Sequence, residues 1–292
     1  MHALLEVLLA RRPVVTDGAW GTELQKLGLA PGEHPDLWNL SHPERVREVA
    51  VSYVEAGSGV ILTNTFRSNR IALGAHAAEI DVAELNTRGV EISRRAAAGR
   101  ARVFASVGPS GRMLMAGEVT EEDLTAAFTE QCHALADAGA DAILIETMAD
   151  IDETRIAVKA ARTTGLPVVA SMVFDSGKEK DRTMMGATPE QVAAALTEAG
   201  ADVIGANCGL GIEGYIPVCC RLRKATQLPL WIKPNAGMPE MTDGRITYRT
   251  TPEQFAAGAR ELRKAGADFI GGCCGTSPAF LRAVAAALRT QD

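Results

Sequence analysis

Three cysteines lie in glycine-rich segments that each follow an apolar run. Cys273 and Cys274 lie in the segment GGCCGT at 271 to 276, and Cys208 lies in GANCG at 205 to 209. Successive strand residues point to opposite faces, so adjacent thiols reach one ion only where a strand ends and the backbone bends, which the flanking glycines favour. Three thiolates converging from two strand ends predict an S3 zinc site with one open position, the pattern of catalytic zinc.

Two other interpretations of these cysteines stay open at this stage. Buried cysteines are often simply small hydrophobic residues, and Cys273 and Cys274 are also candidates for a vicinal disulfide. Cys219 and Cys220 offer an internal comparison, because the surrounding sequence from 215 to 224 predicts a helix. Neighbours on a helix diverge by about 100° and do not easily chelate one ion, so we expect these two, and Cys132, to be core or surface residues.

A short repeated pattern indicates which elements position the thiols. A helix that ends in Ala-Gly-Ala-Asp or a close variant leads into an apolar strand at 55 to 63, 137 to 146, 198 to 206 and 264 to 272. The glycine of each copy is placed to end a helix in the left-handed conformation, and the next residues turn tightly into the strand. Each copy therefore predicts one joint between a helix and a strand.

The repeats belong to a series of eight predicted strands separated by helical patterns. The strands are Val14 to Thr16, Val60 to Thr63, Val103 to Val107, Ala142 to Ile145, Pro167 to Val173, Val203 to Ala206, Leu230 to Lys233 and Phe269 to Gly272. Eight such units in 292 residues predict an α/β fold, a single TIM (β/α)8 barrel spanning 1–292. The apolar segment at the start, which ends in Arg11 and Arg12, predicts an N-terminal capping helix rather than a signal peptide.

The segments that leave the strands are long and polar, whereas the joints into the strands are short, so the carboxyl face is predicted to carry the active site. Glu146 at the tip of the fourth strand is either a ligand contact or the structural partner of an arginine. Asp17 with Gly18 and Gly21 forms either an ordinary turn or an anion-binding nest. Asn235 either caps a turn or fills the fourth position on the metal. Trp20 and Phe66 are candidates for contact with a cationic ligand or for packing.

Composition and charge exclude several functional classes. The formal net charge is −6 and no basic patch stands out, which argues against a nucleic-acid-binding surface. No apolar run approaches the length of a membrane span. Six cysteines without a secretory signal favour a reducing, cytoplasmic location. Four of the five histidines, at 34, 42, 76 and 133, have no spaced partners and are assigned no ligand role.

Taken together, these motifs resemble the homocysteine S-methyltransferase family, the homocysteine-binding barrels of betaine-dependent and cobalamin-dependent methionine-forming enzymes. The resemblance covers essentially the whole chain, through the segments at 17–19, 63–66, 146–147, 207–208 and 271–276. It implies a zinc-dependent enzyme that forms methionine by methyl transfer to zinc-bound homocysteine thiolate. The implied roles are zinc binding by Cys208, Cys273 and Cys274, amino-group binding by Glu146 and Asp17, carboxylate binding near Gly18 and Ala19, and an exchangeable fourth ligand, Asn235.

The methyl donor is not fixed by this resemblance. At Arg67 the chain departs from the animal betaine enzymes, which have a tyrosine near the metal, whereas the segments at 35–42 and 183–186 resemble bacterial betaine-type enzymes. Betaine or another onium compound and a methylcorrinoid all remain candidate donors, and a homo-oligomer is left open. Two rival functions are a phosphate-binding barrel lyase or isomerase, with an anion site at the glycines after the eighth strand, and a homocysteine-binding subunit that works with a corrinoid protein.

Overall fold

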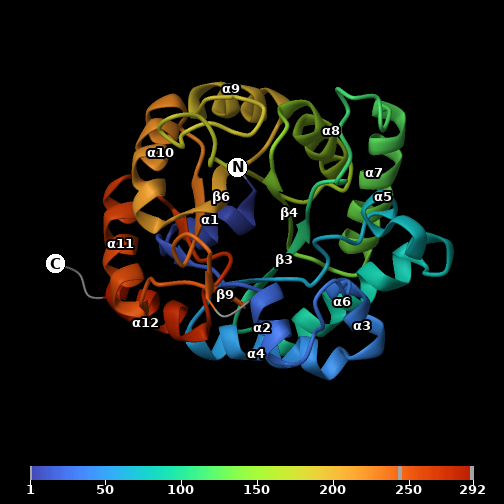
Figure 1. Cartoon of the computed structure of the whole chain (residues 1–292), viewed down its shortest axis with the longest axis horizontal. Helices are drawn as coiled ribbons and strands as arrows, with labels where there is room; N and C mark the ends of the chain where they lie inside the picture. The colour runs from blue at the N-terminus through green and yellow to red at the C-terminus, as the bar shows by residue number, and fades with distance from the viewer. Residues whose placement is uncertain (1, 243–244, 290–292) are drawn as a thin grey trace.

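Eight parallel strands form the centre of the molecule in the order β1-β10-β7-β6-β5-β4-β3-β2. The computed structural model describes residues 2–242 and 245–289. The strands are β1 (Val14–Val15), β2 (Val60–Leu62), β3 (Arg102–Val107), β4 (Ala142–Met148), β5 (Val168–Met172), β6 (Val203–Gly211), β7 (Leu230–Asn235) and β10 (Phe269–Ile270). Helices surround the strands on all sides, as Figure 1 shows, which confirms the predicted TIM barrel.

The ring of helices follows the chain around the barrel (Figure 1). The longer helices are α4 (Pro43–Ala56), α6 (Val82–Ala97), α7 (Glu121–Asp137), α8 (Ile151–Arg162), α9 (Pro189–Ala199), α10 (Ile212–Ala225), α11 (Pro252–Lys264) and α12 (Pro278–Arg289). Shorter helices, α2 (Gly21–Lys26), α3 (Trp38–Ser41) and α5 (Arg70–Leu73), lie in the long segments that follow β1 and β2, together with 3₁₀ turns at Pro35–Leu37 and Gly74–Ala78. None of the helices in the described part of the chain combines the length and apolar character needed to cross a bilayer.

The repeated joints form as the sequence predicts. Their four glycines at 57, 139, 200 and 266 all adopt positive φ angles between 91° and 100°. Thr188 and Thr251 each close a capping box at the start of the helix that follows, with proline in the first turn. Local sequence therefore determines where these helices begin and end.

The barrel closes between β1 and β2 through only a few bonds. The Gly59 N–H donates to the Val15 carbonyl at 2.8 Å. Further along, the backbone N–H of Leu62 donates to the side-chain Oδ2 of Asp17, also at 2.8 Å. A carboxylate thus takes the place of a strand carbonyl where the first and second strands meet.

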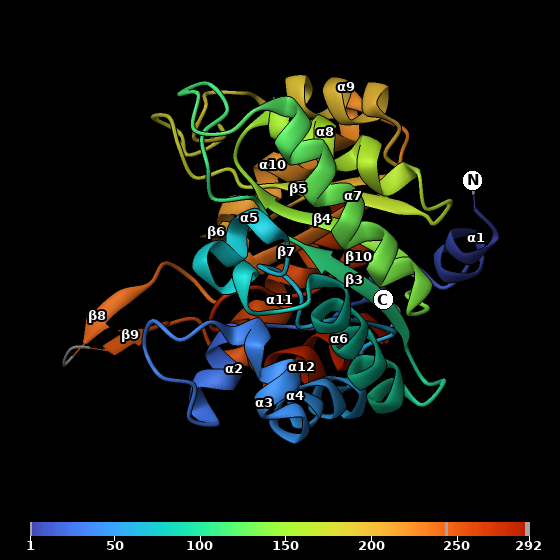
Figure 2. The same ribbon diagram turned by 90° about the vertical axis from the view of Figure 1, so that its right-hand side faces the viewer.

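Alternate strand residues fill the barrel interior, and the others pack against the helices. The interior set includes Phe104, Trp231 and Phe269, with the Trp231 ring centroid 5.8 Å from that of Phe104 and 5.4 Å from that of Phe269. The helix α1 (Ala3–Leu9) buries Leu5 against this interior cluster. Figure 2 shows α1 at one end of the barrel, which confirms the predicted capping helix.

The opposite end of the barrel differs from the sequence prediction in two ways. The segment predicted as a polar loop after the seventh strand contains an antiparallel hairpin, β8 (Glu240–Thr242) with β9 (Arg245–Thr247), which projects from the mouth in Figure 2. Its strands are too short to show an alternating pattern. In addition, β4 and β6 run several residues further than predicted, and each has a register shift near its carboxyl end. Both irregular ends lie at the site described below.

Candidate active site

The three cysteines singled out in the sequence converge at the carboxyl end of the barrel. Cys208 lies near the end of β6, Cys273 and Cys274 follow β10, and β7 lies between these strands. Their sulfur atoms all lie within 4.8 Å of one another, and the Cys208 and Cys274 sulfurs are 4.0 Å apart. Zinc–sulfur bonds of about 2.3 Å in a tetrahedron place two sulfurs about 3.8 Å apart. The cluster therefore fits one tetrahedral ion with three protein ligands.

A strained backbone turns Cys208 toward the other two thiols. Cys208 and Thr147 both have a φ of 62°, a region that residues other than glycine rarely adopt. The Asn207 side chain holds the two positions together, since its Oδ1 accepts the Thr147 backbone N–H at 2.9 Å and its Nδ2 donates to Thr147 Oγ1 at 2.7 Å. Thr147 itself lies in the wall of the cavity described below.

The turn that carries Cys273 and Cys274 depends on its glycines, but not entirely for the predicted reason. Only Gly275 has a positive φ, at 80°. Gly271 and Gly272 are required because a Cβ on Gly271 would lie 1.9 Å from Thr16 Oγ1, and one on Gly272 would lie 2.3 Å from Thr276 Oγ1. Close packing, rather than freedom to bend, therefore explains these two glycines.

Strand β7 fixes the double-cysteine turn. The Cys273 N–H donates to the Pro234 carbonyl at 2.7 Å, and the Cys274 N–H donates to Asn235 Oδ1 at 3.0 Å. Asn235 Nδ2 donates to the Gly209 carbonyl, next to Cys208. In this structure the Asn235 amide thus bridges the segments that carry the two cysteine motifs.

Most backbone N–H groups in the segment that follows β10 donate to acceptors within the protein, so few are available to an anion. The N–H groups of Gly271, Gly272 and Thr276 donate to the carbonyls of Ile232, Asp17 and Cys273, and those of Cys273 and Cys274 donate to β7 as described above. A phosphate site needs several N–H groups pointing outward. The geometry of this segment therefore gives no support to the phosphate-binding alternative.

Without a cation, the clustered thiols resist ionisation. For Cys208, a hydrogen bond with Cys273 favours the thiolate, but the hydrogen bond with Cys274, burial and the charge of the neighbouring thiolate outweigh it and raise the pKa to about 12. The hydrogen bond with Cys208, followed by burial, raises the pKa of Cys273 as well. Three thiolates at this spacing need a positive charge between them, which a divalent metal supplies.

A cavity of about 400 Å³ opens beside the cysteines, and Glu146 lies in its wall. Glu146 is 7% exposed, and its Oε1 accepts the Ser106 hydroxyl at 2.5 Å. Burial raises the pKa of Glu146, and the positive charge of Lys233 and the Ser106 hydrogen bond partly offset this effect. A ligand ammonium group would complete the ionisation of this carboxyl group.

A buried ion pair lies next to Glu146. Lys233 Nζ is 2.6 Å from Asp17 Oδ1, and the exposed fractions of the two side chains are 2% and 0%. Asp17 Oδ2 accepts the indole N–H of Trp20 and the backbone N–H of Leu62, each at 2.8 Å. Both oxygens of Asp17 are thus engaged within the protein, and Lys233, rather than Asp17, lines the cavity.

Sequence reasoning assigned no role to Lys233. The signal was present, because Lys233 ends a strand whose alternation with the interior residue Trp231 turns it inward. A charged residue at an interior position needs a partner of opposite charge. The partner is 216 residues away in the sequence, so the fold had to be known first.

Gly18 and Ala19 also line the cavity, where the sequence predicted binding of a carboxylate. The Ala19 N–H already donates to the Thr276 carbonyl at 3.0 Å. A Cβ on Gly18 would lie 2.7 Å from that same carbonyl oxygen, so only glycine fits there. These residues shape the wall of the cavity next to the cysteines.

Aromatic side chains and one arginine form the outer part of the cavity. Trp20, Phe66 and Tyr248 line it, and Tyr248, just after the β8–β9 hairpin, hydrogen-bonds with Cys274. The exposed side chain of Arg67 lines the same cavity. The cavity therefore combines a metal-binding thiol cluster, a charged inner wall and an aromatic outer wall.

Other candidate features lie elsewhere. The part of the chain that the structure describes contains no further cluster of metal-ligating side chains besides Cys208, Cys273 and Cys274. Cys132 and Cys219 are buried in helices, Cys220 is partly buried, and all six thiols are free, so no vicinal disulfide is present. The ring centroids of His34 and His76 lie 6.1 Å apart, and among the described residues neither imidazole belongs to a cluster of metal-ligating side chains.

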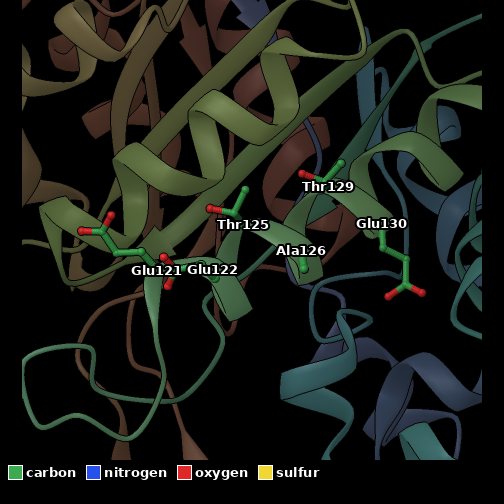
Figure 3. A pocket seen from close by; sticks show the side chains of 6 residues that line it. All are labelled: Glu121, Glu122, Thr125, Ala126, Thr129 and Glu130. Atoms are coloured by element: carbon green, nitrogen blue, oxygen red, sulfur yellow. The ribbon is translucent and has the colours of Figure 1, made fainter.

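A second hollow, of about 650 Å³, lies on the outer surface of α7 (Figure 3). Its lining comes from one helix and consists of glutamates, threonines and an alanine, and Glu130 there is paired with Arg70. These side chains offer neither a nucleophile nor a metal-binding set. The chemistry of the molecule is thus concentrated at the barrel mouth.

Comparisons with known proteins point to one family. A family model described as homocysteine S-methyltransferase matches residues 14–288. The chain is 32% identical over 307 aligned residues to the methionine synthase of Mycobacterium tuberculosis, covering 98% of the chain and 25% of that protein. It therefore spans about a quarter of the length of that relative.

Solved structures give the same result. The metallated form of the homocysteine methyltransferase MmuM from Escherichia coli matches with a TM-score of 0.80 and 26% identity, covering 98% of this chain and 99% of that one. The apo form of the same protein matches with a TM-score of 0.76 at 26% identity, covering 97% and 99% of the two chains.

Proposed function

The chain belongs to the homocysteine S-methyltransferase family and is a methyltransferase, and from this premise we propose that it forms methionine by methylating homocysteine with the help of zinc. The observation that carries the proposal is the cluster formed by Cys208, Cys273 and Cys274 beside a cavity of about 400 Å³. Three thiolates with one open position suit zinc, and the open position is where a substrate thiol would bind.

Zinc, when bound, would supply the positive charge that removes the proton from a substrate thiol with an ordinary pKa of about 8.5. The residues of the chain do the rest. Glu146 would accept the ammonium group of homocysteine, and Lys233 keeps Asp17 in place so that the inner wall stays fixed. Positioning dominates such an in-line displacement, because the thiolate must lie behind the methyl carbon that it attacks.

Asn235 remains a proposed ligand of the resting metal. Its Oδ1 accepts one N–H, from Cys274, which leaves one lone pair of the carbonyl oxygen available. Arrival of homocysteine would then replace this oxygen with sulfur. X-ray absorption at the zinc edge, recorded with and without homocysteine, tests the exchange, and an unchanged spectrum would contradict it.

A second candidate is methyl delivery by a corrinoid-carrying protein. The chain spans about a quarter of the methionine synthases that it resembles. Large hydrophobic side chains are exposed in the segments that follow β3, β5 and β7, the last of which includes β8; they are Met113, Met115, Met184, Met185, Met238 and Met241. Flexible methionines are frequent on surfaces that bind other proteins. These two observations favour a docked partner at the mouth.

The experiment that tests the proposal measures zinc and product in parallel. We expect about one zinc per chain and methionine formation when homocysteine is combined in turn with betaine, S-methylmethionine, S-adenosylmethionine and a methylcorrinoid. The variant Cys208→Ser should lose both zinc and activity, whereas Cys220→Ser, a free thiol outside the cluster, should keep both. Full zinc retention in Cys208→Ser would refute the site.

A further inference from the structure

Two binding groups of the cavity come from strands that do not pair with each other. Glu146 lies near the end of β4 and Cys208 near the end of β6, and β5 separates these strands in the sheet. Both side chains line the same cavity. Under the proposed function, the ammonium group of homocysteine binds Glu146 and its sulfur binds the metal held by Cys208. The separation of the two strand ends therefore has to match the length of the substrate.

Regular strand pairing does not fix this separation, because both strand ends are irregular. The pairing of β4 with β5 shifts its register within 145–148, and the pairing of β6 with β7 shifts within 207–211. Thr147 and Cys208 lie inside these stretches, and both have a φ of 62°. Such backbone conformations persist only where surrounding groups hold them in place. Another contact must therefore hold the two strand ends together.

The Asn207 side chain makes this contact. Its Oδ1 accepts the Thr147 backbone N–H at 2.9 Å, and its Nδ2 donates to Thr147 Oγ1 at 2.7 Å. The Ser171 hydroxyl, on β5, donates to the same Oδ1 at 2.7 Å. The Asn207 carbonyl accepts the Tyr215 hydroxyl at 3.0 Å, so the backbone is also held from α10. One amide group thus joins the ends of β4 and β6 across β5.

Asn207 has no exposed surface, so it does not touch a ligand in the cavity. Its two neighbours in this arrangement, Thr147 and Cys208, do line the cavity. Thr147 is bonded to the Asn207 side chain and directly follows Glu146, and Cys208 directly follows Asn207. Any effect of Asn207 on a ligand therefore passes through the positions of Glu146 and Cys208.

We infer that the Asn207 side chain fixes the span between Glu146 and the metal site, and that this span selects homocysteine over cysteine as the thiol substrate. The inference rests on the proposed function and adds a positioning residue to it. The two amino acids differ by one methylene group, which lengthens the path from Cα to sulfur by one C–C bond of about 1.5 Å. A site held at one length discriminates against a missing methylene group by about 10- to 200-fold.

The test measures binding, so it needs no methyl donor. Calorimetry on the zinc-loaded protein gives the Kd for homocysteine, for cysteine and for 4-mercaptobutanoate, which is homocysteine without its amino group. We expect the wild type to bind cysteine about 10- to 200-fold more weakly than homocysteine. In Asn207→Ser, which removes the amide group, this preference should fall about tenfold, because homocysteine loses affinity. The Kd for 4-mercaptobutanoate should stay unchanged, since this thiol has no ammonium group and does not span the two sites.

A second variant cuts the contact more gently. Thr147→Val keeps the side-chain volume and removes one of the two bonds to Asn207, so the preference for homocysteine should fall about threefold. Thr154→Val is the matched control. Thr154 is also buried, but its hydroxyl donates to the Asp150 carbonyl at the start of α8, outside the cavity. This control should keep the wild-type preference.

Two results would overturn the inference. In the first, Asn207→Ser and Thr147→Val keep the wild-type preference for homocysteine. In the second, 4-mercaptobutanoate loses as much affinity as homocysteine, which would mean that Asn207 acts on the metal site alone. Thr147→Val decides the question if Asn207→Ser does not fold. Zinc content is measured in the same samples, and a wild-type protein that binds zinc but not homocysteine would refute the proposed function itself.

Discussion

The buried pair formed by Lys233 and Asp17 makes the sharpest prediction about how the site is held together. Replacing Lys233 with methionine keeps most of the side-chain volume and removes the charge. Asp17, which has no exposed surface, then loses the partner at its Oδ1 and keeps only the two donors at its Oδ2. A carboxylate is left inside the protein without a counter-charge.

The magnitude follows from this geometry. Removing one partner of a buried ion pair destabilises a protein by about 3–5 kcal/mol. The remaining hydrogen bonds from Trp20 and Leu62 place the expected loss for Lys233→Met at the lower end, about 3 kcal/mol. Asp17→Asn in the same chain removes the uncompensated charge, so the double variant should recover about 2 kcal/mol of that loss.

Urea denaturation of the wild type, both single variants and the double variant provides the measurement. Lys264→Met is the control, because Lys264 forms an exposed pair with Glu261 that should contribute little to the free energy of unfolding. The reasoning fails if Lys233→Met lies within about 1 kcal/mol of the wild type, or if the losses of the two single variants simply add in the double variant.

Three further predictions concern other parts of the chain. Glu146→Gln should raise the KM for homocysteine about ten- to hundredfold with no loss of zinc, because a charge-assisted hydrogen bond to the substrate ammonium group is lost. Steady-state kinetics and zinc analysis of the same samples test this, and loss of zinc would contradict it. Burial, followed by the charge of Arg67, lowers the pKa of His34 from 6.5 to about 4, so the unfolded chain takes up this proton first as the pH falls. The free energy of unfolding of the wild type should therefore fall by about 3 kcal/mol as the pH falls from 6.5 to 4, and that of His34→Gln should not show this fall. Urea denaturation of both proteins across this pH range tests the prediction, and the same pH dependence in both would refute it. Gly275→Ala should lower the free energy of unfolding by about 1–2 kcal/mol and weaken zinc binding. Gly275 has a φ of 80°, and the Cβ of alanine there would lie 2.4 Å from the Tyr248 ring. Thermal denaturation and a zinc competition assay should show the two effects.

Much of the fold was readable from the sequence because its signals are local. A glycine at each joint, a threonine and a proline at several helix starts, and apolar runs of strand length each depend on a few neighbouring residues. The convergence of Cys208 with Cys273 and Cys274 was also predictable, because parallel strands bring their carboxyl ends to one edge. The β8–β9 hairpin was missed, since its short strands pair only with each other.

The roles of the charged residues were harder to predict, because they depend on distant partners. Asp17 was expected to receive a substrate amino group, but its oxygens are bonded to Lys233, Trp20 and Leu62. The glycines at 271 and 272 were assigned to a flexible backbone, although the space left by Thr16 and Thr276 is what requires them. Sequence patterns show where a residue lies along a strand, and only packing shows what it contacts.

The carboxylate that joins the first and second strands also anchors the lysine of the inner wall. The contact that joins the first and second strands and the charged wall of the cavity therefore share the carboxylate of Asp17. If β1 and β2 are not joined, the charged inner side of the cavity is not formed and the substrate cannot bind there. Substrate binding therefore indicates that the barrel is closed. A ligand that binds the charged inner side of the cavity should in turn stabilise the barrel against separation of β1 from β2.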